Sequence, residues 1–502
     1  MRTVLDRDRP KALTAFPWPS RSRAARTALR PAARPGPGPG RHEDPLSSEL
    51  LAPLDLAFWH LETADHPMHL GALARFDPGP ADPAGVLELL AERAAAIPRL
   101  RMRVRDVLLP VGGARWSVDK SFDVHRHVRH IRLPGGGDFA AEAAGLAGEL
   151  MERPLERGLP PWEMYLLTGA PGGPFAVLVK LHHALADGMR AVAIGAGIFD
   201  EIADVTGRGG VGRRRPRPVP PRSWLPGPWS AAGLVGGAAR GRIEELGHAL
   251  GVGASVVRAS RLDPRGTPAL TAESSGTRRL VTAELDLEEI RRVRREAGGT
   301  ANDVLLAVVA GALRHWMLER GDRLPADDPR ALVPVSRRRP GSPPDSGNTF
   351  SAYLLDLPLT DPDPLSRLDA VRRGMDRNKA AGPSRGAGAV AVLADQLPPL
   401  AHRFGAALAG GAARMLFDVL VTNVPLPRSA LSLAGSPLRA LHPMAPLARG
   451  QSLTVAMSPY GGQVHVGLVA DGKALPDLDR LGHALHAELA GLVKATDRSH
   501  PL

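Results

Sequence analysis

The sequence contains no cysteine among its 502 residues. Disulfide bonds, thiolate metal sites and a cysteine nucleophile are therefore all excluded. Aromatic residues make up only 4% of the chain, and they are not interleaved through its basic segments as stacking platforms for bases. The composition therefore argues against a nucleic-acid partner, although the formal net charge is +12.

Long apolar runs are also missing. No stretch reaches the roughly 18 consecutive apolar residues of a membrane-spanning helix. The N-terminus carries Arg2, Arg7 and Arg9 but lacks the apolar core of a secretory signal. We therefore expect a cytoplasmic protein that lies at most on a membrane surface. The 17 histidines show no spacing with carboxylates that indicates a metal site, so no bound metal is predicted.

The positive charge is confined to two segments. Residues 1–44 contain nine arginines and Lys11 against four acidic residues, and residues 206–230 contain six arginines and no acid. Each segment thus carries a net charge of +6, and together they account for the whole excess. Both have the proline-rich and glycine-rich composition of disordered extensions and linkers. Attraction to anionic lipid and plain disorder remain open for both segments.

The length and a hydrophobic fraction of 43% predict two globular domains. The helical and strand patterns found along the chain place them in the mixed α/β class. The expected order is a disordered basic extension at 1–44, a first domain at 45–205, a basic linker with a helical crossover at 206–270 and a second domain at 271–502. The predicted elements include helices at 83–95, 138–151, 304–319 and 478–492, and strands at 97–104, 278–285, 331–336, 452–457 and 463–470.

The stretch 175–188 is an apolar, valine-rich and leucine-rich strand that ends in two histidines. His182 and His183 are followed by Asp187 and Gly188, after which a helical pattern begins at Met189 and is expected to end near Asp204. Histidine has an unperturbed pKa close to neutrality, so it suits a general base, and a strand end holds it rigidly. A purely structural alternative for Asp187 is the N-cap of the following helix.

This order of residues resembles the HHxxxDG motif of the CoA-dependent acyltransferases, which include chloramphenicol acetyltransferase-like enzymes and peptide-synthetase condensation domains. Further segments resemble the bacterial wax ester synthase/diacylglycerol acyltransferase family in their order along the chain. They are Leu51-Ala52-Pro53-Leu54-Asp55, Pro67-Met68-His69-Leu70-Gly71, Pro154 to Trp162, Asn302-Asp303 and Thr422-Asn423-Val424-Pro425. Glu156, Pro161 and Leu426 stand where Asp, Leu and Gly are usual in that family. The resemblance covers roughly residues 45–495.

The resemblance implies two chloramphenicol acetyltransferase-like domains, with mixed sheets flanked by helices and an active-site tunnel at the domain interface. It implies an O-acyltransferase that uses acyl-CoA as cosubstrate and has no bound cofactor. The acyl group would pass to diacylglycerol, to a long-chain alcohol, or to both. Such insoluble acceptors imply a peripheral place at the inner face of the plasma membrane or on lipid droplets.

The same resemblance assigns roles to residues at the motif. His183 is the expected general base, because it alone has the four-residue spacing to Asp187. His182 is expected to be structural or to shape the site, and Asp187 to orient the loop. Gly188 is expected to let the backbone turn without a Cβ.

Other candidate residues come from distant parts of the chain. Asn302 is the first candidate for an oxyanion donor, and Thr422 with Asn423 is the second. Asp303 shares the Asn-Asp pair of the resemblance and also completes a capping-box-like helix start. Trp162 is expected to support the site or the substrate tunnel.

Two other interpretations remain open. One is another transferase of the same fold, of the condensation or polyketide-tailoring type; the absence of carrier-protein modules argues against it. The other is a non-catalytic protein that coats lipid droplets. The presence of His183, Asp187 and Asn302 argues against this second interpretation.

Overall fold

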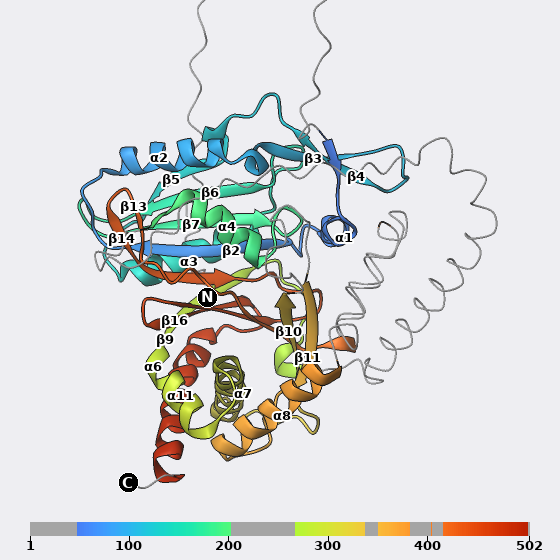
Figure 1. Cartoon of the computed structure of the whole chain (residues 1–502), viewed down its shortest axis with the longest axis vertical. Helices are drawn as coiled ribbons and strands as arrows, with labels where there is room; N and C mark the ends of the chain where they lie inside the picture. Colours follow the sequence, from blue (N-terminus) through green and yellow to red (C-terminus); the bar gives the residue numbers. More distant parts are fainter. Residues whose placement is uncertain (1–47, 202–266, 337–349, 382–402, 404–414, 500–502) are drawn as a thin grey trace, which may run out of the picture. The chain divides into compact units, whose positions relative to one another are not determined.

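The computed structural model describes residues 48–201, 267–336, 350–381, 403 and 415–499 (Figure 1). The predicted basic extension and nearly all of the predicted linker lie outside these ranges. Among the described residues, no helix combines the length and the apolar composition that crossing a membrane requires.

The first half of the chain provides most of a 7-stranded sheet with the order β5-β6-β7-β2-β14-β13-β8. Its own strands are β2 (His69–Phe76), β5 (Val128–Arg132), β6 (Trp162–Thr168), β7 (Phe175–His182) and β8 (Asp200–Glu201). Its helices are α1 (Pro53–Leu61), α2 (Pro83–Ala96), α3 (Phe139–Glu152) and α4 (Gly188–Ile198). A separate 3-stranded sheet contains β1 (Ser48–Leu50), β4 (Ala114–Val118) and β3 (Met102–Asp106) in that order.

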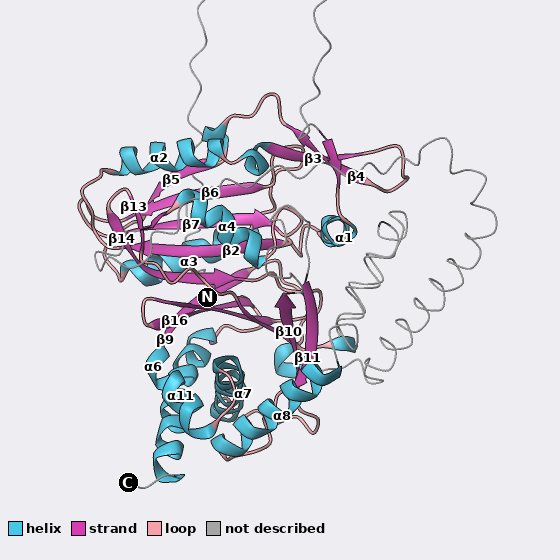
Figure 2. Ribbon diagram, viewed as in Figure 1, coloured by secondary structure: helices cyan, strands magenta, loops and turns pink. Residues whose placement is uncertain are grey.

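The second half builds a 6-stranded sheet with the order β11-β10-β12-β15-β16-β9. These strands are β9 (Arg278–Asp286), β10 (Arg330–Ser336), β11 (Phe350–Asp356), β12 (Val419–Asn423), β15 (Leu453–Tyr460) and β16 (Gln463–Asp471). The helices α6 (Leu287–Ala297), α7 (Ala301–Glu319), α8 (Pro364–Ala381) and α11 (Leu478–Ser499) gather on one side of this sheet (Figure 2). The fold is thus mixed α/β, as the sequence predicts.

Both halves obtain their helices from local capping signals and apolar stripes. The Asp82 carboxylate caps α2 by accepting a hydrogen bond from the Gly85 N–H at 2.7 Å. The helix then buries Val86, Leu90 and Ala94, which lie on one face at helical spacing. Asp138 caps α3 in the same way. The long helix α7 is apolar almost all round because the other helices of the second half surround it.

Buried side chains fix the position of the first sheet between its helices. One cluster joins α2 and α4 to one face of this sheet, and another joins α3 to the opposite face. The second cluster also contains Leu280 of β9 and Val469 of β16, which belong to the other sheet. The strands that end near the two histidines are therefore held from both sides, and one of these layers is shared by both halves.

The predicted separation of the two domains is incomplete. Strands β13 (Leu431–Leu433) and β14 (Ser436–Met444) lie in the predicted second domain, yet both pair within the first half's sheet. β14 runs antiparallel to β2, with Met444 opposite Gly71. Since β14 also contacts β15 and β16 of the other sheet, it ties the two sheets together.

Two predicted elements differ in their bounds. The predicted strand at 97–104 begins only at Met102, because Pro98 opens a 3-10 helix (Pro98–Arg101) and cannot donate to a sheet. The helix after the histidine motif was expected to continue to about Asp204, but α4 ends at Ile198 and β8 follows.

Candidate active site

A largely apolar cavity of about 560 Å³ lies between the two sheets. This volume falls within the usual range for small-molecule sites. Its walls come from β2, β7, α4 and β14 on one side and from α7, β10, β12 and β15 on the other. The polar side chains that line it are His183, Asp187, Asn302, Thr422, Asn423 and Ser458. With Gly188, the structure thus brings six of the predicted site residues, from three distant regions of the sequence, to one cavity.

His183 follows the last residue of β7 and lines this cavity. Its backbone N–H donates to the Met68 carbonyl at 2.8 Å, which extends the pairing of β7 with β2 by one residue. Its ring stacks on Phe58 of α1, with centroids 3.9 Å apart and an angle of 15° between the planes. The imidazole therefore has a fixed orientation before any substrate binds.

Burial lowers the pKa of His183 to about 4, although a hydrogen bond to its own main chain and the charge of Asp187 oppose the shift. A general base must be unprotonated, so this pKa keeps His183 in the competent form at neutral pH. We expect kcat/KM to hold its value as the pH falls through about 6.5, where an unperturbed histidine would lose activity, and to drop only near pH 4.

Unfolding is the competing cause of acid inactivation in this experiment. Burial also lowers the pKa values of His69 and His465 to about 4. Between pH 6.5 and 4 the unfolded chain then binds more protons than the folded one. The free energy of unfolding therefore decreases as the pH is lowered through this window. Denaturant titrations at each pH separate the two effects. A decrease of kcat/KM centred near pH 6.5, in protein that is still folded, would contradict the role of His183 as a base with a lowered pKa.

His182 faces away from the cavity wall, into a buried polar group. Its Nδ1 accepts a hydrogen bond from the Ala184 N–H at 3.0 Å, so the ring proton lies on Nε2. That nitrogen lies 3.4 Å from Oε1 of Glu62, and Nε2 of His69 lies 3.3 Å from the same oxygen. All three side chains are at most 5% exposed. The geometry supports a structural role for His182.

Glu62 is held as an anion at the centre of this group. Burial by itself raises the pKa of the Glu62 carboxyl, but the adjacent imidazoles of His182 and His69 outweigh burial and bring the pKa well below its usual value. Arg157 donates to Oε2 at 2.6 Å and the Met68 N–H to Oε1 at 3.3 Å. The carboxylate therefore joins the start of β2 to the end of β7, directly behind His183.

Asp187 caps α4 and also lines the cavity. Its Oδ1 accepts a hydrogen bond from the Arg190 N–H at 2.8 Å, and the side chain is 7% exposed. Gly188 does not adopt a positive φ, so the expected turn argument does not apply. Instead, a Cβ at Gly188 would lie 3.2 Å from Cγ2 of Val424 on the opposite cavity wall. The glycine keeps this part of the cavity open.

We expect Asp187→Ala to lower the free energy of unfolding by about 1 to 2 kcal/mol, the loss of an N-cap. The turn that carries His183 begins four residues earlier, so transfer should fall as well. Asp82→Ala removes an equivalent cap from α2, away from the cavity, and should cost similar stability without loss of rate. Asp187→Asn keeps a capping oxygen. If this variant is fully stable but inactive, the charge itself participates in the reaction.

The second half presents two asparagines to the cavity. Asn302 opens α7, and Asn423 ends β12. The Asn423 amide donates to Oδ1 of Asn302 at 3.4 Å, which leaves the amide hydrogens of Asn302 for another acceptor. Thr422 also lines the cavity, and Ser458 donates to the Val424 carbonyl at 2.6 Å. This wall therefore carries the hydrogen-bond donors that an oxyanion requires.

Asp303 and Trp162 do not line the cavity. Asp303 is 1% exposed and forms a capping box with Thr300, whose N–H it accepts at 2.8 Å. Trp162 is fully buried in the first half's core, where its Nε1 donates to the Leu100 carbonyl at 2.6 Å and its ring stacks on His127. Asp303 fixes the helix start that positions Asn302, and Trp162 anchors the first residue of β6 in the core of the first half.

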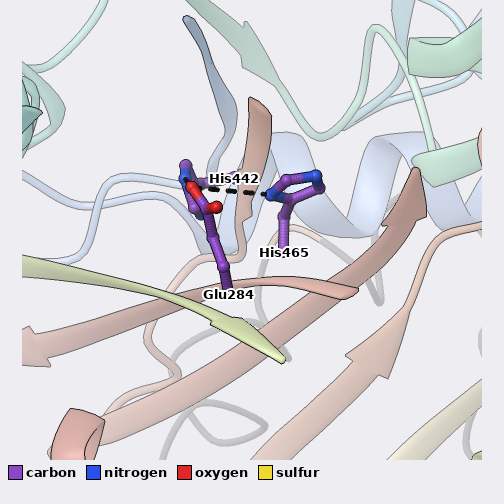
Figure 3. Close-up of side chains that lie close together, drawn as sticks. All are labelled: Glu284, His442 and His465. Atoms are coloured by element: carbon purple, nitrogen blue, oxygen red, sulfur yellow. Dashed lines mark ion pairs between the residues drawn. The ribbon is translucent and has the colours of Figure 1, made fainter. Parts of the chain in front are cut away.

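A second polar group lies where the sheets meet (Figure 3). Oε1 of Glu284 on β9 lies 3.7 Å from Nε2 of His442 and 4.0 Å from Nδ1 of His465. One carboxylate and two imidazoles could together hold a metal ion. No spacing in the sequence indicated that these three residues come together. However, Arg75 of β2 donates to the same Glu284 oxygen, so a cation would have to lie beside a guanidinium. We interpret the group as an ion pair with two histidines that links the sheets.

Sequence reasoning missed Phe58 and Glu62. They lie between two segments that carry the family resemblance, and they are one helical turn apart, so they face the same side of α1 and its C-cap. The four-residue spacing from Phe58 to Glu62 was the only signal in the sequence that could have pointed to them. Their partners, His183 and His182, are more than 100 residues away, and only the pairing of β2 with β7 brings them together.

Comparisons with known proteins match nearly all of this chain. The model for the wax ester synthase/diacylglycerol acyltransferase catalytic domain matches residues 51–305, and the model for the WS/DGAT C-terminal domain matches residues 346–492. A probable diacylglycerol O-acyltransferase of Mycobacterium tuberculosis is 31% identical over 460 residues, which cover 89% of this chain and 96% of that protein. A second one from the same species is 29% identical over 469 residues, which cover 89% and 99%.

Solved structures extend the comparison to the fold. The wax ester synthase/diacylglycerol acyltransferase from Marinobacter aquaeolei VT8 has a TM-score of 0.65 and 25% identity, with coverage of 89% of this chain and 100% of that chain. The starter condensation domain of rhizomide synthetase, solved with C8-CoA and Leu-SNAC, has a TM-score of 0.53 and 15% identity. The match covers 90% of this chain and 94% of the condensation domain, and at this identity it supports a common fold only.

Proposed function

Because the chain belongs to the wax ester synthase/diacylglycerol acyltransferase family, we propose that it is an O-acyltransferase that esterifies diacylglycerol, a long-chain alcohol, or both. The acyl donor is a long-chain acyl-CoA, used as a cosubstrate. The observation that carries the proposal is the placement of His183 on the wall of a largely apolar cavity, opposite Asn302 and Asn423. An apolar cavity with few polar groups suits acyl chains.

His183 is the general base of the proposed reaction. It takes the proton of the acceptor hydroxyl while that oxygen attacks the thioester carbonyl carbon. The tetrahedral intermediate then collapses, the C–S bond breaks, and His183 returns the proton to the CoA thiolate. The products are an ester and free CoA. With no cysteine in the chain, direct attack in a ternary complex is favoured over a thiol acyl-enzyme.

The asparagines supply the electrostatic part of the mechanism. Negative charge develops on the former carbonyl oxygen, and Asn302 donates to it from α7. Asn423 holds the Asn302 amide through the hydrogen bond to its oxygen. Removing one oxyanion donor typically costs about 10²–10³ in kcat.

The proposed place of action is a lipid surface, at the membrane or on a droplet. The acceptors are insoluble, so an open end of the cavity has to receive them from a lipid phase. The two basic segments, 1–44 and 206–230, lie outside the described residues and remain candidate electrostatic anchors.

The experiment that tests this function offers a long-chain acyl-CoA to the full chain with diacylglycerol and with a fatty alcohol in parallel. Product analysis should show triacylglycerol, wax ester, or both, together with one free CoA per ester. Formation of neither ester, with intact folding, would overturn the proposal. Amide formation with an amine acceptor would instead favour a condensation-type enzyme.

A further inference from the structure

The hairpin between β3 and β4 carries an exposed apolar tip. Leu108, Leu109 and Val111, in the connecting residues 107–113, are 93%, 80% and 55% exposed. Single exposed apolar residues are ordinary, but a concentration of them marks a site of interaction. Of the seven large apolar side chains exposed in the described residues, five belong to this hairpin and its three-stranded sheet.

Two unpaired arginines flank the tip. Arg105 of β3 lies directly opposite Arg115 of β4, and Leu50 of β1 lies opposite Arg115 on its other side. Both arginines are exposed, and neither forms an ion pair with another described residue, whereas Arg103 lies 3.5 Å from Asp119. Like charges directly opposite each other destabilise a sheet. The arrangement therefore fits a surface that meets an anionic partner.

We propose that the β3–β4 hairpin inserts its tip into an anionic lipid surface, with Arg105 and Arg115 at the level of the headgroups. Arg105 is three residues from Leu108, and a strand rises roughly 3.3 Å per residue, so the guanidinium group is anchored roughly 10 Å above the tip. This separation matches the roughly 5–10 Å depth to which apolar faces enter a membrane interface. Three side chains fall well short of the roughly 800 Å² that each partner contributes to a stable protein interface.

The hairpin also contacts the helix that packs against His183. Nε2 of His60 on α1 lies 3.0 Å from the Gly112 carbonyl oxygen, at the base of the tip. The same helix carries Phe58, which stacks on His183. A docked hairpin would therefore hold α1 and the neighbouring cavity close to the lipid that supplies the acceptor. The purpose of docking rests on the proposed function, whereas docking itself is measurable without any substrate.

The experiment measures binding of the full chain to sedimentable vesicles of phosphatidylcholine, with and without about 30% phosphatidylglycerol, over a salt series. Leu108→Ser with Leu109→Ser should lower the partition coefficient at least about 30-fold, because two leucines leave the hydrocarbon. Arg105→Gln with Arg115→Gln should lower binding to anionic vesicles roughly tenfold and flatten its salt dependence. Leu318→Ser, at an equally apolar site that is 49% exposed on α7, is the matched control and should change nothing.

Two outcomes would overturn the proposal. One is wild-type binding by both double variants, with binding instead lost on deletion of residues 1–44. Another is a change of oligomeric state in the leucine variant by sedimentation velocity without a change in vesicle binding, which would make the tip a contact between copies. All substituted side chains are exposed, and a wild-type melting temperature confirms folding. The chain could also fail to esterify any acceptor while the variants still lose vesicle binding. That result would refute the proposed function but not the docking.

Discussion

Replacing His183 with alanine is expected to abolish acyl transfer, with kcat/KM lower by about 10²–10⁴. The hydroxyl of an alcohol is a poor nucleophile at neutral pH. Among the described residues that line the cavity, no other base replaces this imidazole, since Asp187 already accepts a hydrogen bond from the Arg190 N–H as the cap of α4. The substitution should leave folding nearly intact, because one face of the ring borders the cavity. Steady-state release of CoA and product chromatography measure the effect.

His182→Ala is the informative comparison. This ring is 1% exposed and donates toward Glu62, so its removal should reduce stability while measurable activity remains. His130→Ala, which removes only a hydrogen bond with Thr168 at 2.8 Å, should keep full activity. Equal loss of transfer in the His182 and His183 variants, with both folded, would show that the two histidines act as one catalytic unit and would contradict the assignment of a single base.

Much of the fold was predictable because its signals are local. The apolar run 175–182 forms β7 as expected, and the alternation on either side of 459–462 forms the β15–β16 hairpin, with Leu453 opposite Ala470. Asp82 and Asp138 cap α2 and α3, which lie where helical periodicity predicts them. Each of these elements follows from neighbours within about ten residues of sequence.

The parts that were not predictable depend on non-local pairing. No periodicity indicates that β14 joins β2 instead of a strand of its own half. Nor does sequence spacing show that β2 and β7 align His69 with His182, which creates the buried group around Glu62. The family resemblance identified residues of both cavity walls, but it did not show that Trp162 and Asp303 lie outside the cavity.

The second large effect is expected from Glu62→Ala. The carboxylate is 5% exposed and lies within 3.4 Å of His69, His182 and Arg157. Removing it leaves two buried histidines without their common acceptor. Breaking a buried charged group by deleting one partner typically costs about 3–5 kcal/mol, and we expect the free energy of unfolding to fall by this amount. Urea titration of the full chain, with activity measured in parallel, gives both quantities.

A matched control separates burial from charge in this test. Glu156 also pairs with an arginine, Arg126 at 3.4 Å, but the two side chains are 65% and 51% exposed. Glu156→Ala should change the unfolding free energy by less than about 1 kcal/mol, because exposed ion pairs contribute little. Glu62→Gln keeps the shape and one acceptor oxygen, so its loss should lie between the two. If Glu62→Ala were as stable as Glu156→Ala, the carboxylate would not organise the strand ends behind His183, and the orientation of that ring would have to depend on its stacking with Phe58 alone.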